Sequence, residues 1–179
     1  MNKTGTSTMK GCFEQLGWEP VASPKSVPRT RRLFKDIFEK GDYSRSLALV
    51  PAFLAFEDRP WNVWEMYRHV DEQFPDSRFV LTVRDPATWW RSVEQWLTRK
   101  KPQMVDVYAT HLRAEAFTKE EFVAGYERHN DAITRYFDGT GKLLVIDVEG
   151  TPRWDELCAF LDVPVPDVPF PHRNRQKYG

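Results

Sequence analysis

Two short apolar runs, each followed by a helix-forming stretch, constrain the fold of this chain more than any other feature. Residues 78–83, RFVLTV, and residues 142–148, KLLVIDV, are nearly continuous apolar stretches. Strands that are buried on both faces of a parallel sheet have this composition, whereas strands with one solvated face alternate apolar and polar residues. Helical patterns follow at 87–99 and 152–161. The alternation of strands and helices predicts an α/β fold with a mainly parallel sheet.

Further elements are expected around this pair of strands. Apolar residues at helical spacing predict four more helices, over residues 6–16, 31–40, 61–74 and 118–137. The last of these begins at Thr118, with Glu121 three residues later in the arrangement of a capping box. Short extended pieces are expected at 18–23 and near Phe56. The five tryptophans at 61, 64, 89, 90 and 96 have helical spacing and are expected mainly in the core.

Composition limits the classes of function. The 179 residues are expected to form a single domain over 1–179, with 41% hydrophobic residues to fill a core. Lys and Arg number 26 and Asp and Glu also number 26, which argues against a general nucleic-acid or anionic-membrane binder. No apolar run approaches the roughly 18 residues of a membrane span. Cys12 and Cys158 are expected to be reduced and buried, in keeping with a cytoplasmic protein.

The opening stretch NKTGTST has the composition of an anion-binding loop that leads into a helix. Backbone N–H groups at a helix N-terminus carry partial positive charge and suit a phosphate or sulfate. Gly5 permits close approach of the backbone, Lys3 adds a charge, and hydroxyl donors come from Thr4, Thr6, Ser7 and Thr8. The G-x-x-x-x-G-K-[ST] pattern of nucleoside-triphosphate loops is not present. An ordinary polar terminus with a Ser/Thr helix cap is the alternative.

A second candidate for anion binding follows the apolar run at 78–83. Arg84 leaves the predicted strand, and Ser92 lies eight residues later on the predicted helix. Ligands of open α/β sheets bind beyond the carboxyl ends of the strands, and an arginine side chain binds two phosphate oxygens at once. The alternative is that Arg84 pairs with Asp85 or a helix end while Ser92 is exposed.

Taken together and in this order, the two motifs resemble those of the sulfotransferases that use 3′-phosphoadenylyl sulfate (PAPS). In that family a K-x-G-T-x-[ST] loop holds the 5′-phosphosulfate, and an Arg-x7-Ser pair holds the 3′-phosphate. The stretches at 74–93 and 143–174 and the helix YERHNDAITRYF look like the bacterial-type branch, and the resemblance covers about residues 2–175. It implies a three-layer sandwich with a P-loop-like nucleotide-binding architecture.

The resemblance also implies a mechanism. An acceptor hydroxyl or amine attacks the sulfur in line, and the product is 3′-phosphoadenosine 5′-phosphate (PAP). Lys3 would stabilise the leaving phosphate, the backbone N–H groups of residues 5–8 would hold the phosphosulfate, and no metal is required. A late loop closes over the cofactor in related sequences, so Arg173, Asn174 and Arg175 are expected to contact it, unless the tail is simply a solvated basic terminus.

The general base is open among several residues. Asp58 matches by position the acidic residue that some family members place near the acceptor, and Glu57 is second. These two carboxylates would instead cap a helix that begins near Trp61. His69, expected to be a packed or surface histidine, and His111 are the remaining candidates.

The acceptor and the start of the sheet are the least constrained features. The acceptor is expected to be a small molecule, a carbohydrate or a lipid. Competing functions are a kinase-like phosphotransferase and a non-catalytic nucleotide-binding remnant.

Related chains carry an apolar strand directly before the loop, whereas only Met1 and Asn2 precede Lys3 here. We expect either an internal start or a sheet that closes without this strand.

Overall fold

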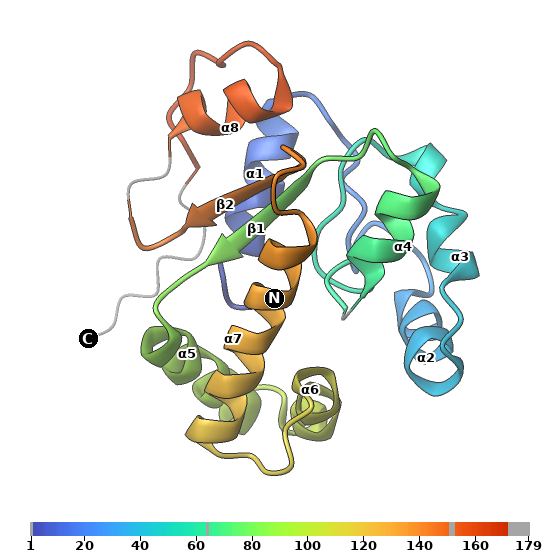
Figure 1. The fold of residues 1–179 in the computed structure, drawn as a ribbon, viewed down its shortest axis with the longest axis vertical. Coiled ribbons are helices and arrows are strands. Elements are labelled where there is room, and N and C mark those ends of the chain that lie inside the picture. The colour runs from blue at the N-terminus through green and yellow to red at the C-terminus, as the bar shows by residue number, and fades with distance from the viewer. Residues whose placement is uncertain (1, 64, 151–152, 172–179) are drawn as a thin grey trace.

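A computed structural model describes residues 2–63, 65–150 and 153–171 of the chain. Within this part, two strands form a parallel sheet: β1 (Phe79–Val83) pairs with β2 (Leu143–Asp147), in register from Phe79 opposite Leu143 to Val83 opposite Asp147. The predicted α/β class with parallel strands is therefore confirmed, with a sheet that is small (Figure 1).

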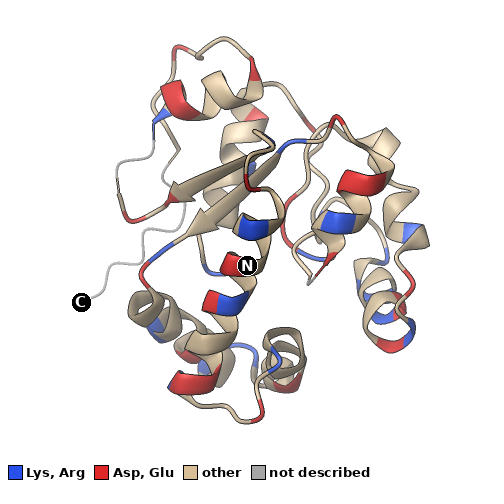
Figure 2. Cartoon of the chain, viewed as in Figure 1, with Lys and Arg blue, Asp and Glu red and all other residues tan. Residues whose placement is uncertain are grey.

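Helices surround the sheet. Their bounds are α1 (Thr6–Gln15), α2 (Thr30–Lys40), α3 (Ser44–Leu47), α4 (Met66–Gln73), α5 (Pro86–Arg99), α6 (Val105–Leu112), α7 (Lys119–Tyr136) and α8 (Trp154–Leu161). Two short 3-10 helices are η1 (Val50–Ala52) and η2 (Pro102–Met104). Acidic and basic residues are interspersed over the helices (Figure 2).

Side chains pack on both faces of the sheet, which explains why its strands are largely apolar, although Val145 of β2 is exposed. On one face, Val80, Leu144 and Ile146 pack in a cluster with residues of α1 and α8. On the other face, Leu81 and Leu143 pack in a cluster with residues of α4 and α7. In Figure 1, α7 lies in front of the strands and α1 behind them.

A further hydrophobic cluster joins α5, α6 and α7. Trp89 and Trp90 of α5 are buried in it, and Trp96 packs against it. Trp61 is partly buried in another cluster. The expected core role of these tryptophans is confirmed, and Trp64 lies outside the described residues. Cys12 and Cys158 are both buried, and neither is part of a disulfide.

Several boundaries differ from the prediction, each for a local reason. The helix expected from Trp61 begins only at Met66, because Glu65 has left-handed backbone (φ 69°) and interrupts the helical path. Residues 18–23 form no regular strand; Ala22 makes a single parallel bridge to Phe56. The Thr118 side chain caps α7 as predicted. The Glu121 carboxylate, however, accepts from the Glu115 N–H and not from Thr118.

Candidate functional site

The loop before α1 lies across the carboxyl ends of β1 and β2. The hydroxyls of Thr4 and Thr82, the latter near the end of β1, are hydrogen-bonded at 2.8 Å. The Arg84 guanidinium donates to the Lys3 carbonyl at 3.2 Å, and the Trp89 indole N–H donates to the Asn2 carbonyl at 3.1 Å. Three contacts from β1, the turn after it and α5 therefore fix the path of the loop.

Gly5 makes the turn from this loop into α1. Its φ of 87° is in the left-handed region, where glycine is strongly favoured. A Cβ at this position would lie 2.9 Å from Cγ1 of Val148, just past β2. Glycine thus lets the helix begin directly against the end of the sheet. The N–H groups of Thr6 and Ser7, in the first turn of α1, lie at this end of the sheet, and the Thr8 N–H donates to the Gly5 carbonyl.

Lys3 and Arg84 bring positive charge to the loop. Lys3 is half-buried, and its pKa is lowered by burial and by the positive charges of Lys100 and Arg84. Burial is the larger cause, and the contributions of Lys100 and Arg84 mean that positive charge gathers near the Lys3 side chain, which a bound anion would offset.

The Arg84 side chain is held by a carboxylate. Its Nη2 and Nε donate to Oε1 of Glu149 at 2.7 and 3.3 Å, and the backbone N–H of Asp85 donates to Oε2 of Glu149 at 3.0 Å. The alternative, in which Arg84 pairs with Asp85, does not occur, since the Asp85 carboxylate caps α5 through the Thr88 N–H and Arg84 pairs with Glu149. Glu149 therefore occupies the kind of position, between a guanidinium and a backbone N–H, that suits a phosphate oxygen.

Of the remaining residues expected to bind the cofactor, the structure describes those in α1 and α5 and not those in the C-terminal tail. Ser92 lies on the buried face of α5 and is 2% exposed, so the alternative of an exposed helix residue is wrong. Thr6, Ser7 and Thr8 form the first turn of α1. Arg173, Asn174 and Arg175 lie outside the described residues, and their predicted contacts stay predictions.

Glu57 and Asp58 lie beside the loop. Asp58 accepts hydrogen bonds from the Asn2 side-chain amide and from the Arg59 N–H. Burial and the Asp58 carboxylate raise the pKa of Glu57 to about 7, against the opposing effects of Lys10 and of a hydrogen bond from the Thr6 side chain. Since α4 begins only at Met66, neither carboxylate caps the helix that was expected there.

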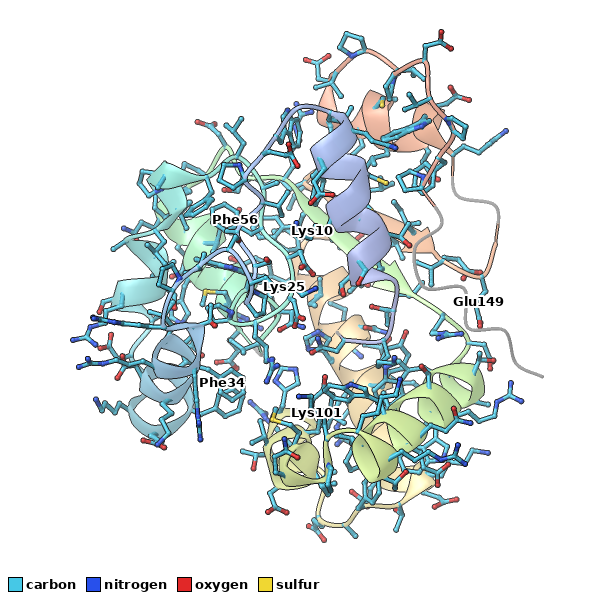
Figure 3. All side chains as sticks on the ribbon, turned by 180° about the vertical axis from the view of Figure 1, so that it is seen from behind. Lys10, Lys25, Phe34, Phe56, Lys101 and Glu149 are labelled. Carbon is cyan, nitrogen blue, oxygen red and sulfur yellow. The ribbon has the colours of Figure 1, made fainter. Side chains whose placement is uncertain are left out.

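The two carboxylic acids near the start of α1, Glu57 and Glu149, have different surroundings. Figure 3 shows Phe56, the neighbour of Glu57 in the chain, and Glu149 on opposite sides of α1. The Glu57 carboxyl has a raised pKa, whereas the Glu149 carboxylate is paired with the Arg84 guanidinium.

The histidine candidates are packed side chains. His69 packs against Tyr43 with ring centroids 4.0 Å apart and the ring planes tilted by 36°. His111 lies on α6, a helix that was not predicted, and its ring is 5.6 Å from that of His129. Burial lowers the pKa of His111 to about 3 and that of His129 well below its usual value, so both imidazoles are neutral near pH 7.

Comparison with protein families shows the class of domain in which this loop lies. The family model described as the sulfotransferase domain matches residues 1–116 and, in a second overlapping segment, residues 98–178. The chain belongs to the sulfotransferase domain family. The loop at Lys3 and Arg84 therefore lies in a sulfotransferase domain, a family of sulfuryl transferases. No curated protein matches the chain.

Two features of this sulfotransferase domain carried no recognisable signal in the sequence. Glu149 follows a strand in an EGTP stretch that reads as a turn, and Thr82 is one letter within an apolar run. Their contacts depend on the pairing of β1 with β2.

Among the described residues, no helix is both long and apolar enough to cross a membrane. No group of three or more His, Cys, Asp or Glu side chains that could hold a metal occurs in the same part of the chain.

Proposed function

We propose that this sulfotransferase domain transfers the sulfuryl group of PAPS to a hydroxyl or amine of an acceptor. The observation that carries the proposal is the contact of the Lys3 loop with Arg84 at the carboxyl ends of the parallel strands. Two cations and the N-terminus of α1 converge there, as an anion with two phosphate-type groups requires. The proposal includes the expected three-layer, P-loop-like architecture and a cytoplasmic location.

The residues fit the donor in the following way. The N–H groups at the start of α1, with the hydroxyls of Thr6, Ser7 and Thr8, hold the phosphosulfate. Lys3 neutralises the charge that develops on the leaving 5′-phosphate. Arg84 and Ser92 hold the 3′-phosphate. To do so, the Arg84 guanidinium leaves the Glu149 carboxylate and binds the phosphate in its place. PAPS supplies the activated sulfuryl group, and no metal is needed to bring positive charge to this loop.

The acceptor proton requires a base. Asp58 remains a predicted base, but Glu57 is favoured, because a base with a pKa near the working pH is the most effective. When the acceptor oxygen or nitrogen bonds to sulfur, the bond from sulfur to the 5′-phosphate oxygen breaks, PAP leaves, and the acceptor proton goes to the Glu57 carboxylate. A small molecule, a carbohydrate or a lipid remains the proposed acceptor class.

Titration calorimetry with PAP, and separately with ATP and Mg²⁺, tests the donor site. PAP is expected to bind and ATP with Mg²⁺ is not, and Lys3→Ala and Arg84→Ala should each weaken PAP binding about tenfold or more. Lys35→Ala is the control, because Lys35 pairs with Glu39 on the exposed surface of α2. Binding of ATP with Mg²⁺ without PAP would indicate a phosphotransferase. Binding of neither nucleotide would indicate a non-catalytic remnant.

A further inference from the structure

The ring of Tyr126 is part of the hydrophobic cluster that joins α5 and α7, two helices that lie side by side (Figure 1). Tyr126 comes from α7 and is 1% exposed. It stacks on Trp89 of α5, with ring centroids 4.4 Å apart and an angle of 14° between the ring planes. Because closely packed rings have little freedom to turn, the contact between the two helices fixes the position of the Tyr126 hydroxyl.

The Tyr126 hydroxyl binds the backbone of Arg84, the residue that follows β1. It accepts a hydrogen bond from the Arg84 N–H at 3.1 Å and donates one to the Arg84 carbonyl at 3.3 Å. Within the described residues, neither of these two groups has a backbone partner. A phenol can accept and donate at once, and burial raises the pKa of Tyr126, so the phenol keeps its proton near pH 7. One side chain thus satisfies both polar groups of this backbone position.

The other member of the stacked pair reaches the Lys3 loop. The Trp89 indole N–H donates to the carbonyl of Asn2, the residue directly before Lys3, at 3.1 Å. The stacked pair therefore contacts the backbone beside Lys3 and the backbone of Arg84, the two cations of the proposed donor site. Removal of the Tyr126 hydroxyl alone would leave the contact of Trp89 with Asn2 in place.

The contact of Arg84 with Glu149 differs from the contact with Tyr126 in one respect. Glu149 holds Arg84 by the guanidinium, and the proposed function requires this carboxylate to give way to the 3′-phosphate. The Tyr126 hydroxyl binds only backbone groups of Arg84, so it does not compete with a phosphate for the guanidinium. The contact with Tyr126 can therefore persist while the guanidinium changes its partner.

We propose that Tyr126 is a positioning residue for the 3′-phosphate of the donor: its hydroxyl holds the backbone of Arg84, so that the guanidinium reaches the phosphate from a fixed position. This inference rests on the proposed function, because it concerns how the 3′-phosphate is bound. An arginine whose backbone is already held loses less freedom when it binds its ligand. Loss of the hydroxyl should therefore weaken recognition of the 3′-phosphate and not that of the 5′-phosphate.

Tyr126→Phe tests the proposal, because it keeps the stacked ring and removes only the hydroxyl. Titration calorimetry with PAP, and with AMP, which lacks the 3′-phosphate, gives the ratio of the two affinities. The variant is expected to bind PAP about three- to tenfold more weakly and AMP as tightly as the wild type does. Arg84→Ala gives the ratio that remains without the guanidinium. Tyr108→Phe is the matched control, because Tyr108 is buried in the same cluster and its hydroxyl has no hydrogen-bond partner in the described part of the chain.

Hydrogen exchange gives a second readout, one that needs no nucleotide. In Tyr126→Phe the Arg84 amide is expected to exchange about tenfold faster or more, because its hydrogen-bond acceptor is gone. The Leu81 amide is the internal reference, since Leu81 pairs with β2. Tyr108→Phe should change the exchange of neither amide.

The two ways in which the proposal can fail are distinguishable from failure of the donor site itself. If the wild type binds PAP more tightly than AMP, an unchanged affinity ratio or an unchanged Arg84 amide in Tyr126→Phe would overturn the role of Tyr126 and leave the proposed function standing. An equal loss of affinity for both nucleotides would also overturn it, because Tyr126 would then support the whole site. A wild-type domain that binds PAP no more tightly than AMP would overturn the proposed donor site, and the role of Tyr126 with it.

Discussion

Replacing Glu57 with glutamine should stabilise this sulfotransferase domain while removing its transfer activity. Burial and the Asp58 carboxylate raise the pKa of Glu57 from its ordinary 4.5 to about 7. Below pH 4.5 the carboxyl is neutral in both the folded and the unfolded chain. Between pH 4.5 and 7 only the unfolded chain ionises, so the free energy of unfolding falls as the pH rises.

The size of the effect follows from the difference between the two pKa values. Without screening, the raised pKa of Glu57 would lower the free energy of unfolding at high pH by about 3 kcal/mol. Solvent screening of a half-buried carboxyl reduces this loss to about 1–2 kcal/mol. Glutamine is neutral at every pH and has nearly the same shape. Glu57→Gln should therefore raise the unfolding free energy by about 1–2 kcal/mol at pH 8, or the melting temperature by about 2–8 °C, and change neither at pH 4.

Urea unfolding at pH 4 and at pH 8 measures this difference, with Asp58→Asn as the matched control. Asp58→Asn removes the repulsion of Glu57 but also weakens the hydrogen bonds that the carboxylate accepts from Asn2 and from the Arg59 N–H, so it should stabilise the fold at pH 8 less than Glu57→Gln does. Turnover of PAPS by Glu57→Gln should fall by about 10²–10⁴-fold with PAP affinity unchanged. An equal gain in stability at both pH values, or a loss at pH 8, would refute the reasoning about Glu57.

Three further variants test the loop, its partner and the scaffold. Gly5→Ala should lower the free energy of unfolding by about 1–2 kcal/mol, because the backbone at this position has a left-handed φ of 87°. It should also weaken PAP binding, since the new Cβ displaces Val148. Calorimetry that shows unchanged PAP affinity would contradict this. Glu149→Gln should tighten PAP binding about fivefold, because the 3′-phosphate no longer competes with a carboxylate for Arg84; weaker binding would instead make Glu149 the residue that positions Arg84. Thr118→Ala removes the cap of α7 and should lower the unfolding free energy by about 1 kcal/mol; any accompanying change in PAP affinity would count against a purely structural role.

Local patterns in the sequence were sufficient for the parts of the fold that depend on neighbouring residues. The two buried strands, the helices that begin at Thr6 and after Thr118, and the loop between Lys3 and Thr8 were all predicted, because apolar periodicity, caps and glycine act over a few residues. The start of α4 was missed, since the left-handed backbone of Glu65 is not encoded in helical spacing.

Only the tertiary structure decided which distant side chains meet. The pairing of β1 with β2 brings Glu149 to Arg84, two residues that are 65 positions apart, and the burial of residues 55–58 beside the loop changes the pKa of Glu57. A cavity lined by residues 79–82 of β1 is likewise invisible in the sequence, because a cavity is a property of neighbours in space. The sequence by itself determined the identity and spacing of the groups proposed to bind the anion. Long-range packing determined their partners, their charge states and the cavity beside them, because desolvation and Coulomb interactions depend on distance in space and not along the chain.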